Sequence, residues 1–375
     1  MPRSHFPNDQ TVAQSAAVQR LGAAAARVRS AIAACPRYAV TGLHRLSGLA
    51  RAWGLGEIWV KDERDRLGLG SFKALGGAYA VLLLSRSIAV AAGRADCSIA
   101  GLLAQPHPAL ATTTFAAATS GNHGRSVAAG ARLVGARCVV FAKQDAPPRQ
   151  LRAIADLGAE IVRVSGSYDD AVDACRRACA EHGWVAVPDT ADDPNDDVVA
   201  HVMEGYTLIA AELVERLPRR PSHVVVQAGV GGLAAAVAGH LVAVNGRAAP
   251  RVIVAEPDAA ACLQASAMAG RPVSLPRSSI STMGRLDCYA PSLPAWSVLQ
   301  SIVAAYVSVS DAQADDACRV LAERRLHTTP SGAAGLAALA QLATSPDARA
   351  RLELTPHSDV VVFVTEAALS DAPSA

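Results

Sequence analysis

The chain has 375 residues, of which 51% are hydrophobic and 18% are charged, and its formal net charge at pH 7 is +2. This length and composition are enough for two domains or one large α/β unit with a sizeable core, and they exclude a disordered chain. The near balance of charge argues against nucleic acid or a membrane surface as the main partner. The longest apolar runs are interrupted by Arg86 or His240, so we expect them to be buried helices too short to span a bilayer.

The first residues do not resemble a signal peptide, because no apolar stretch follows them closely. We therefore expect a soluble, cytoplasmic protein. Eight cysteines are scattered along the chain without a Cys-x-x-Cys pair, so we expect neither a zinc site nor another metal site. In a reducing compartment most of these cysteines should be free thiols.

The first notable stretch follows a predicted helix at 15–34 and a predicted strand at 57–61. Residues 70–77 contain Lys73, and an apolar helical run continues from there to about residue 90. Only three of the 35 Lys and Arg residues are lysines: Lys61, Lys73 and Lys143. At a helix N-terminus the dipole favours the neutral, nucleophilic form of a lysine amine. Lys73 is therefore a candidate for amine chemistry, and a solvated surface lysine is the alternative.

Strands and helices then alternate. We predict strands at 112–118, 138–142, 160–164, 184–187, 223–227, 252–255, 305–309 and 359–365, with helices between them, including 149–157, 168–182, 202–217 and 311–325. We predict residues 91–111 as a loop with a short helix. Strands that alternate with helices of this length indicate βαβ units and parallel sheets, so the fold class is α/β.

Two loops lie where a strand meets a helix. The first, residues 119–124, contains Asn122 and offers backbone N–H groups and hydroxyls that suit a carboxylate. The second, residues 228–233, contains three glycines that let the backbone cradle an anion such as a phosphate. A dinucleotide-binding turn remains an alternative, although Ala234 stands where that motif needs glycine and only Glu256 could serve as its ribose-binding acid. A tight turn without a ligand is the other alternative.

Three motifs resemble the segment that carries the Schiff-base lysine in fold-type II pyridoxal-phosphate (PLP) enzymes. They are Lys61-Asp62-Glu63, Ser71-Phe72-Lys73 and Gly76-Gly77. This family includes threonine and serine dehydratases, cysteine synthases and the diaminopropionate ammonia-lyases, which the chain resembles most. Pro188-Asp189-Thr190-Ala191 and Met203-Glu204-Gly205-Tyr206 extend the likeness, which covers about residues 38–366.

The resemblance implies two open, twisted, mainly parallel sheets flanked by helices, with PLP between two domains. It implies a large PLP-binding domain at 1–85 and 205–375, a small substrate-side domain at 86–204, and a homodimer. It places the cofactor against Lys73, Phe72, Asn122, Gly229, Val230, Gly231, Gly232, Leu233 and Thr365. It places the substrate carboxylate against Thr119, Ser120, Gly121 and His123.

Position 120 departs from the most similar relatives. Diaminopropionate ammonia-lyases resemble this chain here but carry Asp, which is understood to be the base for the D-substrate, whereas Ser120 is typical of dehydratases. The resemblance makes Asp189 the family's second acidic residue. It also matches Cys262 and Cys288 to a cysteine pair that can form a disulfide near the site.

The resemblance implies α,β-elimination on a small, diaminopropionate-like amino acid, giving a 2-oxo acid and ammonia. The expected catalytic residues are Lys73, which holds PLP and removes the α-proton of an L-substrate, Asp189, which binds or protonates the β-group, and Ser120. The hydroxyl of Thr365 would face the pyridine nitrogen. Alternatives are a serine, threonine or hydroxyaspartate dehydratase, a β-replacement synthase, and a non-catalytic PLP-binding protein.

Overall fold

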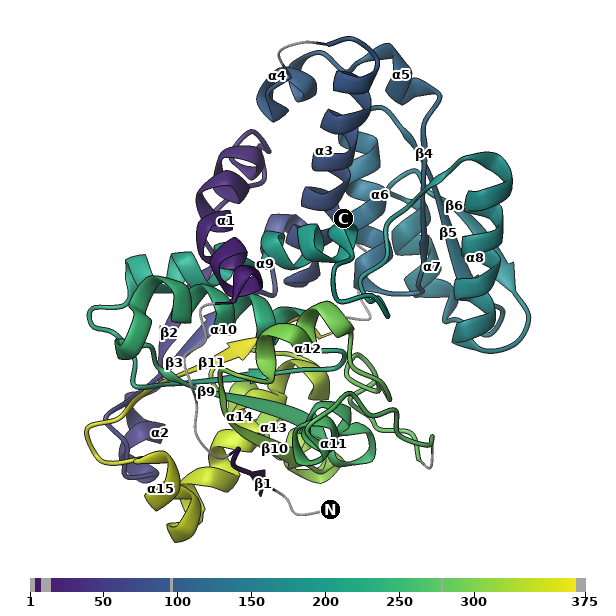
Figure 1. Ribbon diagram of the computed structural model, residues 1–375. Coiled ribbons are helices and arrows are strands. Elements are labelled where there is room, and N and C mark those ends of the chain that lie inside the picture. The colour runs from purple at the N-terminus through teal and green to yellow at the C-terminus, as the bar shows by residue number, and fades with distance from the viewer. Residues whose placement is uncertain (1–3, 8–14, 95–96, 278, 369–375) are drawn as a thin grey trace.

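A computed structural model describes residues 4–7, 15–94, 97–277 and 279–368. The chain forms two sheets, which Figure 1 shows in separate parts of the molecule. The larger has seven strands in the order β1-β10-β9-β8-β11-β3-β2, and the smaller has four in the order β6-β5-β4-β7. The prediction of an α/β fold with two mainly parallel sheets is confirmed.

The larger sheet is parallel at its centre and antiparallel only at its two edges. Its strands are β1 (Ser4–His5), β2 (Gly42–Arg45), β3 (Glu57–Asp62), β8 (His223–Gln227), β9 (Arg251–Pro257), β10 (Val303–Val309) and β11 (Asp359–Val364). The central strands are rich in valine and are buried on both faces, as expected for parallel strands covered by helices on each side.

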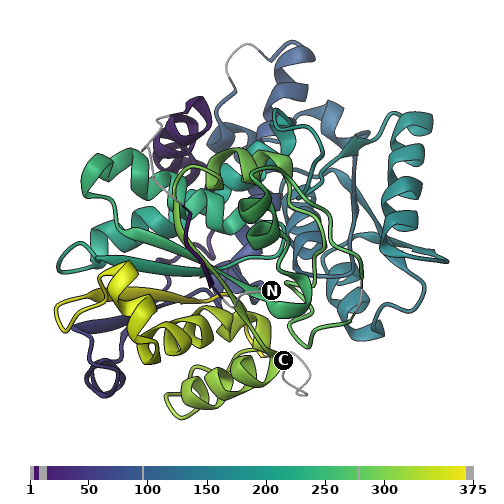
Figure 2. The ribbon, with the colours of Figure 1, turned by 60° about the horizontal axis from the view of Figure 1, so that its bottom comes forward.

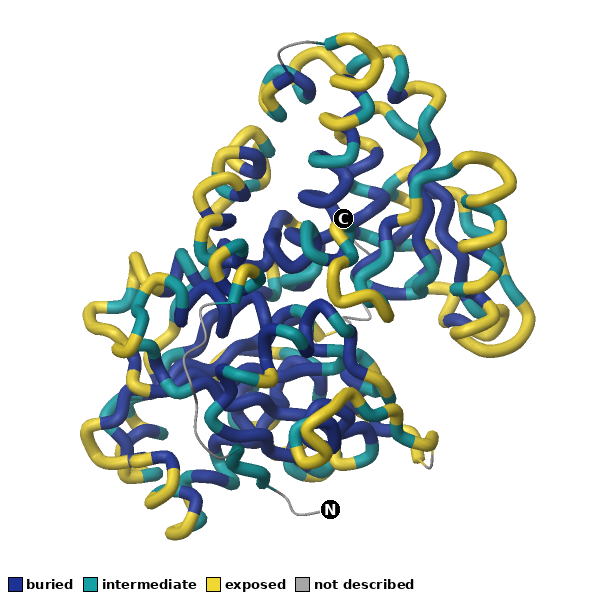
Figure 3. Tube along the Cα trace, viewed as in Figure 1, coloured by how far each residue is buried: buried dark blue, intermediate teal, exposed yellow. Residues whose placement is uncertain are grey.

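Helices cover both faces of this sheet. One face packs against α1 (Ala16–Ile32), α9 (Asp197–Arg216), α10 (Gly232–Asn245) and α12 (Leu293–Leu299). The other packs against α2 (Ser47–Ala52), α13 (Asp311–Ala322), α14 (Pro330–Thr344) and α15 (Pro346–Leu352). Alternation along β8 explains the two cores, because Val224 and Val226 point into the first and Val225 into the second. Figure 3 shows the buried segments concentrated in these strands and the helices beside them.

The smaller sheet is entirely parallel. It consists of β4 (Thr114–Ala118), β5 (Arg137–Lys143), β6 (Glu160–Val164) and β7 (Val185–Ala186). Three helices cover it: α6 (Asn122–Leu133), α7 (Pro148–Ala155) and α8 (Tyr168–His182). Figure 2, turned by 60°, again shows this teal part beside the larger green and yellow part. The smaller sheet lies within 86–204, and the domain boundaries themselves stay a prediction.

Helix α3 (Lys73–Ala91) joins the two parts, because it packs against α6 from one and α9 from the other. It is long and apolar enough to cross a membrane by length and composition alone, so the expectation that every apolar run is too short was wrong. Arg86 lies inside this helix and does not interrupt it. Its guanidinium Nε donates to the carbonyl of Cys97. The helix is mostly buried among its neighbours, as a core helix is.

Most elements lie where the sequence predicts them, with ends that differ by a few residues. Three differences are larger. Residues 91–111 contain two short helices, α4 (Ile99–Ala104) and α5 (Pro108–Ala111), instead of one. Strands β1 and β2 and helix α15 were not predicted, and no separate elements were predicted for the stretch that contains α11 (Cys262–Ala269) and α12.

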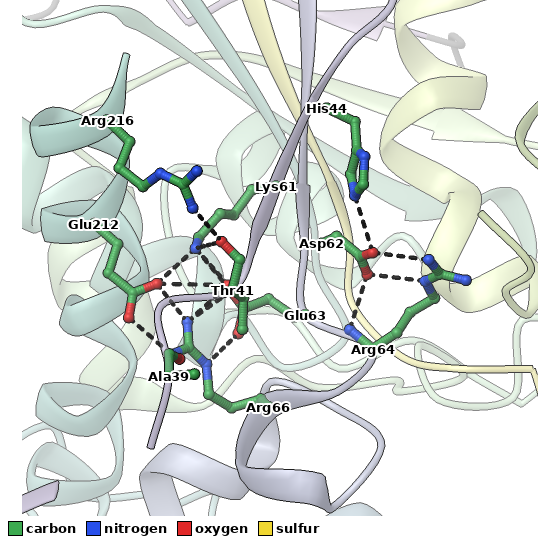
Figure 4. Close-up of polar contacts among 10 residues, drawn as sticks. All are labelled: Ala39, Thr41, His44, Lys61, Asp62, Glu63, Arg64, Arg66, Glu212 and Arg216. Carbon is green, nitrogen blue, oxygen red and sulfur yellow. Dashed lines mark hydrogen bonds and ion pairs between the residues drawn. The ribbon is translucent and has the colours of Figure 1, made fainter. Parts of the chain in front are cut away.

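A fully buried charge cluster connects β3 to α9 (Figure 4). The cluster consists of Lys61 in β3, Glu63 and Arg66 in the turn after β3, and Glu212 in α9. Each of these residues is at most 1% exposed. Glu212 accepts from Lys61 at 2.6 Å and from Arg66 at 2.8 Å, and Arg66 also donates to Glu63 at 2.7 Å. Two cations and two carboxylates balance, and Thr41 adds a hydroxyl that donates to Glu63 at 2.6 Å. The cluster therefore fixes the end of β3 and the turn after it to α9, shortly before residues 70–73.

Candidate active site

The loop before Lys73 is pinned to the end of β11. Phe72 N–H donates to the carbonyl of Thr365 at 3.0 Å, and the N–H of Ala367 donates to the carbonyl of Gly70 at 2.9 Å. Ser71 forms an isolated antiparallel bridge with Glu366. These contacts fix the backbone immediately before Lys73, which is the first residue of α3 as predicted.

Glycines let the start of α3 approach its neighbours. A Cβ on Gly76 would lie 2.5 Å from the ring of Tyr206, and one on Gly205 would lie 2.8 Å from the Cα of Gly76. A Cβ on Gly77 would lie 2.9 Å from the hydroxyl of Ser126. That hydroxyl donates to the carbonyl of Ala74 at 3.0 Å. The Gly-Gly motif thus provides close contact to α9 and α6 and holds Lys73 at a defined place.

Lys73 faces Asp189, which follows β7 of the smaller sheet. Lys73 Nζ donates to Asp189 Oδ2 at 2.6 Å. Burial alone would raise the pKa of Asp189, but Lys73 and His123 more than offset it and hold that pKa well below its usual range. Asp189 is therefore a carboxylate next to the amine. The sequence predicted both residues for the site but not their direct contact.

The other two lysines do not supply an amine at this site. Lys61 is buried in the charge cluster with Glu212. Lys143, at the end of β5, is half-buried and is paired with Asp145 at 3.2 Å. Only Lys73, whose side chain is 28% exposed, faces the residues predicted for the site.

The loop at residues 119–124 lies beside this pair. The hydroxyl of Thr119 accepts from the N–H of Gly121 at 3.1 Å, and Ser120 is half-buried. His123 Nε2 contacts the carbonyl of Val187 at 2.7 Å, which requires the proton to be on Nε2. His123 Nδ1 is buried without a hydrogen-bond partner among the described residues, and burial lowers the pKa of His123.

The glycine loop at residues 228–233 connects β8 to α10. Gly231 has φ +102°, a left-handed conformation that favours glycine. No side chain in the described part of the protein caps the N-terminus of α10, so its first N–H groups can face an anion. Val230, Gly232 and Leu233 complete the loop.

Both predicted cysteines lie against Gly229. Cys262 Sγ is 3.8 Å from the carbonyl oxygen of Gly229, and Cys288 Sγ would lie 3.0 Å from a Cβ at Gly229. Burial raises the pKa of Cys288 to about 11 and that of Cys262 well above its usual value. Both are free thiols in the structure, so the disulfide stays a prediction.

The structure argues against the alternative that residues 228–233 form a dinucleotide-binding turn, because Glu256 is not available to bind a ribose. The fully buried carboxylate of Glu256 accepts from the N–H groups of Leu263 and Gln264, both at 2.8 Å, and so caps α11. Burial raises the pKa of Glu256 to about 8. Glu256 is a helix cap and does not hold a ribose at the glycine loop.

Sequence reasoning missed Glu366. Its carboxylate accepts from Asn122 Nδ2 and from the hydroxyl of Thr329, each at 2.6 Å, and it lies near Arg285. A carboxylate opposite Asn122 requires the amide nitrogen to face it, so the orientation of that amide is settled. Only its place directly after Thr365 at a strand end could have indicated Glu366. The hydroxyl of Thr365 itself accepts from Gln227 Nε2 at 3.3 Å.

These residues fit PLP. Lys73 supplies a partly exposed amine, the uncapped start of α10 and Gly231 form a cradle for a phosphate, and Asn122 has a second amide N–H left to donate. The two sheets contribute opposite sides: Asp189 and Asn122 come from the smaller one, and the glycine loop and Thr365 from the larger one.

Comparison with known proteins agrees with this geometry. Residues 35–366 match the model of the pyridoxal-phosphate dependent enzyme family, and the chain belongs to that family. It is a PLP-dependent enzyme of fold type II.

The particular relatives are ammonia-lyases. The chain is 34% identical over 352 residues to diaminopropionate ammonia-lyase of Salmonella typhimurium, which covers 88% of this chain and 86% of that protein. It is similar to the crystal structure of the holo form of diaminopropionate ammonia-lyase from Escherichia coli, with a TM-score of 0.87, 31% identity and coverage of 97% and 93%. A second structure of the E. coli enzyme, in complex with D-serine, matches with the same TM-score, identity and coverage.

Proposed function

We propose that this chain is a PLP-dependent ammonia-lyase that removes ammonia from diaminopropionate or a closely similar small amino acid by α,β-elimination and leaves a 2-oxo acid. The observation that supports this most strongly is the contact of Lys73 with Asp189 at 2.6 Å, beside two loops built to hold anions. The similarity to diaminopropionate ammonia-lyases over most of the chain supports the substrate.

When bound, PLP withdraws electrons from the substrate's α-carbon and so weakens its α C–H bond. Lys73 Nζ is the group that accepts the α-proton of an L-substrate. Asp189 Oδ2 lies within hydrogen-bond distance of that nitrogen, so a proton can pass between the two. In its ionised form Asp189 also attracts a cationic β-amino group and holds it in place for departure.

A second candidate function is dehydration of serine, threonine or hydroxyaspartate. The observation that favours it is Ser120, a half-buried residue in the loop at 119–124, where dehydratase-like members of the family carry serine. We further propose, on family likeness alone, that the protein is a cytoplasmic homodimer. Light scattering on a gel-filtration column measures the oligomeric state.

The test compares Lys73→Ala with Lys143→Ala. The purified protein is incubated with PLP, and the visible absorbance of the bound cofactor and the release of ammonia and 2-oxo acid from L-diaminopropionate are measured. Lys73→Ala should lose both signals and keep its circular-dichroism spectrum, because it removes the only lysine amine at the site. Lys143→Ala should keep both. Full turnover in Lys73→Ala would show the assignment to be wrong.

A further inference from the structure

Residues 285–288 pass between the two loops of the site. The carbonyl oxygen of Arg285 and the Cα of Leu286 would lie 3.4 Å and 3.3 Å from a Cβ at Gly229 in the glycine loop. In the other direction, Nη1 of Arg285 would lie 2.7 Å from a Cβ at Gly121. The guanidinium of Arg285 therefore lies directly on the loop at 119–124, and a side chain at Gly121 would collide with it.

The guanidinium of Arg285 has donors to spare. The backbone N–H of Arg285 donates to Ser331 Oγ at 3.0 Å, but its side chain donates no hydrogen bond to any residue that the structure describes. Among the residues that the structure describes, it forms an ion pair with Glu366 alone, at 3.6 Å between Nε and Oε2. That carboxylate already accepts from Asn122 and Thr329 at 2.6 Å each. Because the Arg285 side chain is 29% exposed, a small anion has access to it.

A second guanidinium adds to the positive charge. Arg125 of α6 would have Nη1 3.2 Å from a Cβ at Gly70, in the loop that leads to Lys73. Its Nε is buried without a hydrogen-bond partner, and Arg125 forms no ion pair within the described part of the chain. Burial and the charge of Arg285 lower the pKa of Arg125. Of these two guanidiniums, Arg285 has a carboxylate nearby, Glu366, and Lys73 and Asp189 balance each other.

The loop at 119–124 also has one donor fewer than its sequence indicates. The N–H of Gly121 is taken by the hydroxyl of Thr119 at 3.1 Å, so an anion bound here must find another donor. The fork of an arginine side chain supplies two parallel N–H groups that match a carboxylate.

We propose that Arg285 binds a carboxylate of the amino-acid substrate, with Arg125 adding positive charge behind it. This rests on the proposed function in so far as the substrate is an amino acid. The carboxylate has two sources: the α-carboxylate that every amino acid carries, or a second carboxylate on the β-carbon, as in 3-hydroxyaspartate.

The test measures kcat and KM of the PLP-loaded enzyme for L-serine, L-serinamide and 3-hydroxyaspartate. Hydrogen bonds to a charged group are strong enough that Arg285→Gln should raise KM for a bound carboxylate about 10- to 100-fold. Arg285→Lys keeps the charge without the fork and should recover part of the loss. The matched control is Arg277→Gln, since Arg277 lies shortly before these residues in the chain but is exposed and stacks on Tyr289.

The pattern of KM values identifies the source. An equal rise for serine and hydroxyaspartate, with no change for serinamide, assigns Arg285 to the α-carboxylate. A rise confined to hydroxyaspartate assigns it to a second carboxylate. Unchanged KM values for all three in Arg285→Gln overturn the proposal.

Calorimetric binding of acetate and malonate separates this proposal from the proposed function, because it needs no turnover. If no amino acid releases ammonia but acetate or malonate binds about ten times more weakly to Arg285→Gln than to Arg277→Gln, the lyase assignment fails and the carboxylate site stands. If neither turnover nor anion binding depends on Arg285, the carboxylate site is wrong even where the lyase activity is present.

Discussion

Position 120 shows how one residue can narrow a substrate range. In the proposed reaction one amine, Lys73, reaches one side of the substrate's α-carbon, so removing the α-proton of a D-substrate requires a base on the opposite side. The resemblance to diaminopropionate ammonia-lyases implies that those enzymes carry Asp at that place, and one structure of the E. coli enzyme is a complex with D-serine. Here Ser120 is half-buried and its hydroxyl has no hydrogen-bond partner among the described residues that could activate it.

We therefore expect a strong preference for L-substrates. The loss of a positioned base typically costs about 100- to 10,000-fold in rate, so kcat/KM for D-diaminopropionate should be lower than for the L-enantiomer by about that factor. Ser120→Asp should raise the D-activity selectively, and its L-activity serves as the internal control. Comparable kcat/KM values for the two enantiomers of the unmodified enzyme would contradict this expectation.

At the scale of elements, the buried ion pairs of the charge cluster fix the position of β3 relative to α9. The cluster holds the strand that leads to the catalytic loop against a helix more than a hundred residues further along the chain (Figure 4). Each cation in it has a carboxylate partner, so the desolvation of its charges is compensated only while all four are present.

Glu212→Gln should therefore be costly. It leaves Lys61 and Arg66 with one carboxylate between them, and breaking a buried ion pair in this way destabilises a protein by about 3–5 kcal/mol. Urea unfolding of the cofactor-loaded protein measures the change. The matched control, Glu215→Gln on the same helix, removes a half-exposed partner of Arg29 and should cost less than about 1 kcal/mol. Equal losses in the two variants would mean that the buried cluster adds little stability.

For the whole molecule, the alternation of strands and helices predicted parallel sheets, and the local pattern placed Lys73 at the start of a helix. That there are two sheets was implied by the family resemblance, and the anion-binding roles of the two loops stay predictions. The sequence did not predict Glu366 or Arg285. The contact between Asn122 and Glu366 joins residues 244 positions apart, and no local pattern contains both. For α3 the expectation of a buried helix was right, and only the expectation that the run is too short to span a bilayer was wrong, because the helix continues past Arg86 to Ala91.

The site takes residues from both sheets, so the cofactor should hold the molecule together. A ligand present at 100 times its Kd adds about 2.7 kcal/mol of stability, and removal of PLP should lower Tm accordingly. Adding PLP back should restore Tm. Adding pyridoxal, which lacks the phosphate, should restore it only in part if the glycine loop holds that group. Full recovery with pyridoxal would show that residues 229–233 do not bind the phosphate.

The scarcity of lysine has a practical consequence for handling this enzyme. Reagents that attack lysine amines find Lys61 shielded inside the protein and Lys73 occupied while the cofactor is bound, which leaves Lys143 at the end of β5. Lysine-directed labels, cross-linkers and resin attachments should therefore converge on one side chain of the smaller sheet. Molecules coupled through this side chain would share a common orientation without any engineered handle.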